Sequence, residues 1–257
     1  MSRFGNLEFE ADASRSHGET RVEHDANYWG LEAERAFNRA EFETALRFFA
    51  RVLEFNPDQV SAWTGQVRAL IELGEFREAK VWADKALERF PTAPELLAAK
   101  GVALGRLGDV DSALAFSDAS LEERGDTAYI WLARGDVLLA RKEKLADHCF
   151  ERARSLAAGA WWVTWLAARV RYYYGQFAAA LKQAQQAAAQ DAGQFVVWVL
   201  LGDCQLALGL SDAARVSWTQ GQQLEPGSRS LTERLLALRQ RSWLQKGWGK
   251  LRGLLHS

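Results

Sequence analysis

A cysteine follows a histidine directly at His148-Cys149, and an imidazole beside a thiol can act as the base that forms a nucleophilic thiolate. The pair falls in a predicted helix, where adjacent side chains point about 100° apart. The imidazole is therefore poorly placed to take the thiol proton. The second cysteine, Cys204, has neither a CxxC companion nor a nearby pair of histidines. We interpret both cysteines as buried thiols of a reducing compartment.

Other motifs for catalysis, nucleotide binding or metal binding are absent from the sequence. It holds no HExxH, no GxGxxG after a strand, no P-loop and no GxSxG. The remaining histidines, His17, His24 and His256, are scattered, and the carboxylates resemble those of solvated helix faces. We therefore expect no enzyme activity, no cofactor and no metal site.

One interval of 34 residues runs through most of the chain. Large residues recur at this interval, with one step of 33: Trp29, Trp63, Leu97, Trp131, Thr164 and Trp198. Small residues follow four places later: Ala33, Val67, Gly101, Gly135, Ala168 and Gly202. A second small series is Ala45, Ala79, Ala113, Ala146, Ala180 and Ala214. Such a period indicates a repeat array in which each unit buries its apolar face against its neighbours.

Each repeat is predicted to contain two helices, which must position any binding residues. The second repeat, residues 60–93, shows this most clearly. Apolar residues at helical spacing predict a first helix over 61–73, and Gly74 ends it in the left-handed conformation that glycine adopts readily. A second helix starts near Phe76 and is stopped by Pro91.

This pattern resembles the tetratricopeptide repeat, on the residues Trp63, Val67, Phe76, Ala79, Ala86 and Pro91 of the second repeat. The resemblance covers about residues 26–228 and implies an all-α fold, an α-solenoid of six helix-turn-helix repeats. The sequence departs from the pattern at Thr164, and one residue is lost between Gly135 and Ala146. We therefore expect the junction between the fourth and fifth repeats to be the weakest.

The resemblance also implies a binding surface, because the first helices of tetratricopeptide proteins line a concave groove that usually binds peptides or partner helices. In the first three repeats the groove positions are mixed and polar, and they include Asn27, Gly30, Glu34 and Ser61. We expect Arg68 and Arg106 to project there and to select an acidic or carboxylate feature of the ligand. The Lys and Asn set that grips chaperone C-termini in some family members is not here, since Gly30 and Glu34 stand where it would begin.

In the last three repeats the same positions are largely apolar and aromatic. The expected contact residues are Tyr129, Leu132, Trp162, Trp165, Arg169, Tyr172, Tyr173 and Val199. Aromatic residues with arginine are common anchors of binding sites. The competing interpretation assigns the stretch 161–174 to the core, with Trp161 or Trp162 filling the place left by Thr164.

The two ends differ from the array in composition. Residues 1–25 carry six acidic against three basic side chains and few apolar ones, so we expect a disordered acidic tail. Residues 229–257 carry seven basic side chains against one acidic, and Leu231, Leu235, Leu236 and Leu238 can form a capping helix. Residues 242–256 then form a basic amphipathic stretch, with one apolar side made of Trp243, Leu244, Trp248, Leu251, Leu254 and Leu255.

Composition narrows the class of protein further. A net charge of −1 over 257 residues lacks the basic excess of a general nucleic-acid binder, so we expect no nucleic acid. The first residues do not resemble a signal peptide, and no run of about 18 apolar residues predicts a membrane span. We expect a cytoplasmic protein, with attachment to a membrane surface through residues 242–256 as an alternative.

Three hypotheses for function follow. The first is a non-catalytic scaffold or adaptor that binds an apolar peptide or amphipathic helix of a protein partner in its groove. The second is a peripheral membrane scaffold anchored by the C-terminal helix. The third is a regulatory subunit whose C-terminal helix inserts into a larger enzyme assembly. Residues 242–256 could also contact the protein's own groove. The sequence does not indicate which oligomeric state the protein adopts.

Overall fold

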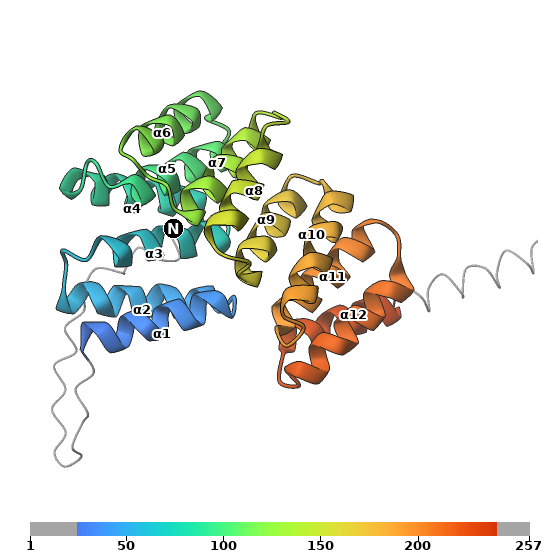
Figure 1. Ribbon diagram of the computed structural model, residues 1–257. Coiled ribbons are helices and arrows are strands. Elements are labelled where there is room, and N and C mark those ends of the chain that lie inside the picture. Colours follow the sequence, from blue (N-terminus) through green and yellow to red (C-terminus); the bar gives the residue numbers. More distant parts are fainter. Residues whose placement is uncertain (1–24, 241–257) are drawn as a thin grey trace, which may run out of the picture. The chain divides into compact units, whose positions relative to one another are not determined.

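The computed structural model describes residues 25–240, and within them every regular element is an α-helix (Figure 1). The first helices of six successive repeats are α1 (Ala26–Asn38), α3 (Val60–Glu72), α5 (Pro94–Leu107), α7 (Ala128–Ala140), α9 (Trp161–Tyr173) and α11 (Phe195–Ala207). The second helices are α2 (Phe42–Phe55), α4 (Phe76–Arg89), α6 (Val110–Glu122), α8 (Ala146–Leu156), α10 (Phe177–Gln190) and α12 (Ser211–Leu224). A further helical segment covers 229–240. The expected all-α repeat fold is confirmed.

The chain forms two compact units that divide between Ala157 and Ala158. In the first unit α5 packs against both α3 and α7, so the first helices form a row, and each second helix contacts the first helix of its own repeat. In the second unit α10 packs against α9 and α11, and α12 packs against α11. The division falls in the connection between the fourth and fifth repeats. The residue missing from the 34-residue spacing is lost earlier, within the fourth repeat between Gly135 and Ala146.

Small residues are required where the two helices of a repeat approach each other. A Cβ added at Gly135 in α7 would collide with the ring of Phe150 in α8. A Cβ at Gly202 in α11 would likewise collide with the indole of Trp218 in α12. At these two positions the large second-helix side chain lies directly on the backbone of the first helix, which explains the glycine there.

A left-handed turn ends the first helix of each repeat. Its φ is positive at Ala40, Gly74, Gly108, Lys142, Gly175 and Gly209, with the same spacing as the repeats. Glycine adopts this conformation without steric cost. At two positions of this series, Ala40 and Lys142, the residue has a side chain, which makes the left-handed conformation sterically unfavourable; their φ angles are 58° and 61°.

In the second and sixth repeats, the tryptophan at the large position bonds the first helix to the loop that leads into it. The indole nitrogen of Trp63 donates to the Pro57 carbonyl at 2.9 Å, and that of Trp198 donates to the Ala192 carbonyl at 2.8 Å. Thr164 takes this place in the fifth repeat, where it is 1% exposed. Among the described residues its Oγ1 has no hydrogen-bond partner.

The segment 229–240 covers the last apolar face of the second unit. Leu231 is fully buried against Ala214 and Trp218, and Leu235 and Leu238 pack around the same cluster. Leu236 differs from the expectation, because it is 52% exposed. Within residues 25–240 no helix combines the length and the apolar character needed to cross a membrane.

Candidate functional site

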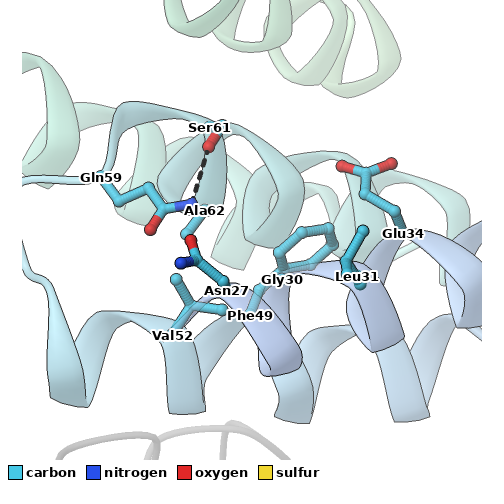
Figure 2. Close-up of a pocket in the computed structure, with 9 residues that line it drawn as sticks. All are labelled: Asn27, Gly30, Leu31, Glu34, Phe49, Val52, Gln59, Ser61 and Ala62. Atoms are coloured by element: carbon cyan, nitrogen blue, oxygen red, sulfur yellow. Dashed lines mark hydrogen bonds between the residues drawn. The ribbon is translucent and has the colours of Figure 1, made fainter. Parts of the chain in front are cut away.

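A hollow of about 350 Å³ opens between α1, α2 and α3 of the first unit (Figure 2). Its floor is apolar, because Phe49, Val52 and Ala62 are buried there. Space remains above Gly30, since a Cβ at that position would meet only the Gln59 side-chain nitrogen, at 4.0 Å. The hollow therefore exists because α1 has a glycine where it faces α3.

Polar side chains and one exposed leucine surround this floor. Figure 2 shows the amides of Asn27 and Gln59 at one end and the side chains of Leu31 and Glu34 at the other. The Gln59 nitrogen donates to the Ser61 hydroxyl at 3.3 Å, which holds the rim of the site. Leu31 is 62% exposed and adds apolar surface to the rim. The geometry suits an apolar side chain in the hollow and amide hydrogen bonds around it.

Arg68, a predicted groove residue, lies between two aromatic rings of the same unit. Its guanidinium carbon is 4.5 Å from the ring centre of Phe37 in α1 and 4.3 Å from that of Tyr129 in α7. Its Nε is buried and has no hydrogen-bond partner among the described residues. The rings stabilise the cation through their electron-rich faces and hold its plane in place.

Carboxylates surround this stack. Burial raises the pKa of the Tyr129 phenol well above its usual range; the cation of Arg68 opposes the shift, and the nearby charges of Asp136, Glu72 and Glu95 add to it. One arginine and several carboxylates therefore set the electrostatic potential around the stack, and the stack is not a positive patch.

Arg106 does not project as a free cation, and the expectation that it does is wrong. Its guanidinium makes a two-pronged ion pair with Asp136 of α7, with Nε–Oδ1 and Nη2–Oδ2 distances of 3.0 and 2.6 Å. The two side chains are 8% and 4% exposed. Arg106 is therefore already neutralised and links the third repeat to the fourth. Leu132 is also buried, at 4% exposure, so the prediction of a contact there is wrong too.

Trp165 of the second unit belongs to the core rather than to a contact surface. It is 2% exposed, and its indole nitrogen donates to the Val196 carbonyl of α11 at 3.2 Å. Arg169 lies over the same ring, with its guanidinium carbon 5.1 Å from the ring centre, and Trp161 packs at 6.1 Å. The competing interpretation of this stretch as core is therefore right for Trp165.

The other predicted aromatic residues of α9 are more accessible. Tyr173 is 48% exposed, whereas Trp162 and Tyr172 are half-buried. Val199 is half-buried against the cluster that contains Trp218. The C-terminal contact residues Trp243, Leu244, Trp248, Leu251 and Leu255 lie outside the described residues.

The thiols are shielded. Cys149 and Cys204 are buried, and burial raises the pKa of both, that of Cys204 to about 12. The His148 ring faces the indole of Trp131, with 6.3 Å between ring centres. Residues 25–240 contain no group of three or more His, Cys, Asp or Glu side chains placed to hold a metal ion.

Comparison with known proteins identifies this arrangement. A family model for the tetratricopeptide repeat matches residues 10–157, more than half of the chain, and a second tetratricopeptide repeat model matches residues 166–221. The chain belongs to the tetratricopeptide repeat family. It is a helical repeat scaffold of the type that carries protein–protein interactions, and members of this family are generally not catalytic.

Individual relatives match less of the chain. The Hsp70-Hsp90 organizing protein of Triticum aestivum is 31% identical over 101 residues, which cover 35% of this chain but only 17% of that protein. A tetratricopeptide repeat protein from Parabacteroides merdae superposes with a TM-score of 0.54 at 16% identity, covering 83% of this chain and 84% of its own. A thermophilic one from Thermus thermophilus gives 0.50 at 15% identity, covering 83% and 98%. The structural likenesses show the fold.

Proposed function

We propose that this protein is a non-catalytic adaptor that binds an apolar peptide or a helix of a partner protein along the first helices of its first unit. The observation that carries the proposal is the hollow above Gly30, with its buried floor of Phe49 and Val52. An apolar ligand side chain fits this floor. The amides of Asn27 and Gln59 can then bond the ligand backbone, which gives affinity without demanding a particular sequence.

The charges near the site favour a ligand that is neutral or basic. The ion pair with Asp136 removes Arg106 from ligand binding, and two rings hold Arg68. Glu34 is exposed on the rim of the hollow. A lysine or arginine of the ligand beside Glu34 would therefore be favoured. Selection of an acidic ligand now rests on Arg68 alone and is the competing outcome.

A substitution that fills the hollow tests the proposal. Gly30→Trp places an indole in open space, and removing a glycine from a helix also favours the helix. Val81→Trp is the matched control, because Val81 lies in the second helix α4 and is already 62% exposed. Peptides selected from a random display library on the wild-type chain should bind Val81→Trp equally well. They should lose at least about tenfold in affinity for Gly30→Trp, since an anchor side chain contributes about 1.4 kcal/mol or more.

Recovery of the same peptides on Gly30→Trp at unchanged affinity would refute binding in this hollow. Affinity for the selected peptides should fall in Glu34→Gln if the ligand is basic, and rise if it is acidic. The proposal places the protein among interaction scaffolds, with the cytoplasm as the expected compartment. A role as a chaperone-tail adaptor, prompted by the name of the wheat relative, is disfavoured because Gly30 and Glu34 replace the residues such a site begins with.

A further inference from the structure

A second hollow lies within the second unit, beside the last described residues. It measures about 490 Å³, and Gln240, the last described residue, is among the residues that line it. Tyr172 of α9, Leu206 of α11 and Trp218 of α12 line it, together with Arg234, Ala237 and Leu238 of the segment 229–240. Its volume lies in the range of about 300–1,000 Å³ that is typical of ligand sites.

The walls of this hollow are apolar with one neutralised ion pair. Arg234 Nε and Nη2 donate to the two carboxylate oxygens of Asp203 at 2.7 and 3.0 Å, so the pair presents no net charge. Tyr172 is held by the Phe177 ring, with 5.3 Å between ring centres. Leu206 and Leu238 supply aliphatic surface. An aromatic side chain with one polar atom suits such walls better than a charged side chain, because the walls offer no unpaired charge to a charged group.

The chain itself carries such side chains immediately beyond this rim. Seventeen residues, 241–257, follow Gln240, and they include Trp248 eight residues farther on. Eight residues reach at most about 28 Å, ample for a return into a hollow that Gln240 itself lines. Gly247 and Gly249 flank Trp248, and glycine permits the reversal of direction that the return needs. A short tether holds Trp248 near the hollow at an effective concentration of roughly 1 mM.

We propose that residues 241–257 dock on their own second unit, with the indole of Trp248 in the hollow between Tyr172 and Leu238. The tail is then an internal ligand, and a partner of the second unit must displace it to reach the hollow. At an effective concentration of about 1 mM, a local dissociation constant of about 0.1 mM leaves about one tail in ten undocked. The inference is independent of the proposed function of the first unit.

Trypsin cleavage of the full-length protein tests the docking. Lys246 and Lys250 flank Trp248, so docking should slow cleavage after both lysines about tenfold. Ala237→Trp fills the hollow from an exposed position and should release the tail, raising the cleavage rate about tenfold. Leu236→Trp is the matched control, since Leu236 is the adjacent residue, is 52% exposed and does not line the hollow; it should keep the wild-type rate.

Trp248→Ala should give the same acceleration as Ala237→Trp, with unchanged thermal stability of the second unit in both. Equal cleavage rates in the wild type, Ala237→Trp and Leu236→Trp would overturn the proposal. Protection that appears only on vesicles containing phosphatidylserine would also overturn it, in favour of a membrane-binding tail. Protection that increases with protein concentration would do the same, in favour of docking on a second copy of the chain.

Discussion

Replacing Asp136 with alanine should destabilise the first unit by about 3–5 kcal/mol, because the substitution removes the carboxylate that makes a two-pronged ion pair with the buried Arg106 cation. The magnitude follows from burial: the Arg106 side chain is 8% exposed and that of Asp136 is 4% exposed, so water cannot replace the lost partner. At about 3 °C per kcal/mol, the melting temperature of this unit should fall by roughly 10–15 °C.

The Arg234–Asp203 pair provides the matched comparison. It has the same two-pronged geometry, but its side chains are 34% and 18% exposed. Asp203→Ala should therefore destabilise the second unit by only about 1 kcal/mol, because solvent screens the arginine that remains. The double change Arg106→Met with Asp136→Leu should recover most of the stability lost in Asp136→Ala, since it removes both buried charges.

Urea unfolding followed by circular dichroism measures these differences as shifts of the midpoint at constant slope. The reasoning would be refuted if Asp136→Ala lost less than about 1 kcal/mol, or if Asp203→Ala lost as much. Either result would mean that burial does not set the strength of these pairs.

Further predictions concern the repeat turns, the fifth repeat, the buried cysteines and the junction between units. Ala40→Gly and Lys142→Gly should each raise the free energy of unfolding by about 1 kcal/mol, because each residue now occupies a left-handed conformation. The urea midpoint should rise accordingly, and a lower midpoint would contradict this. Thr164→Val should stabilise the second unit by about 1 kcal/mol by removing a buried hydroxyl that has no partner, and a loss of stability would show that the hydroxyl is satisfied. Cys149 and Cys204 should resist alkylation of the folded protein at pH 8, since burial raises both thiol pKa values, that of Cys204 to about 12, and keeps the thiols protonated at that pH. When alkylation is measured at increasing urea concentrations, labelling of Cys149 should follow unfolding of the first unit and labelling of Cys204 unfolding of the second. Equal labelling midpoints would argue against a weak junction at 157–158.

The sequence predicts the repeats well because the same residues that set the pattern also make the contacts. A first helix expected over 61–73 is observed as Val60–Glu72, and the second helix begins at Phe76 as expected. Glycines such as Gly135 and Gly202 mark the points where a second-helix ring lies on the first-helix backbone. The recurring pattern of large and small side chains in the sequence therefore reflects this packing directly.

The candidate site could be predicted only in part, because spacing places a residue on a helix face but does not reveal what faces it. The partner of Arg106 lies 30 residues away at Asp136, and the acceptor for Trp165 lies 31 residues away at Val196. The neighbouring repeat supplies both partners. The repeat register predicts the positions of Gly30 and Glu34, whereas the hollow itself depends on side chains from three helices.

The stacking of Arg68 between Phe37 and Tyr129 has a consequence for cooperativity. A linear repeat array is described by the stability of each repeat and its coupling to the next one along the chain. This stack joins the first, second and fourth repeats, so it adds a coupling that skips a neighbour. Unfolding of α7 would leave the half-buried cation of Arg68 without one of its two rings. The first four repeats should therefore unfold together, with a steeper transition than nearest-neighbour coupling alone would produce.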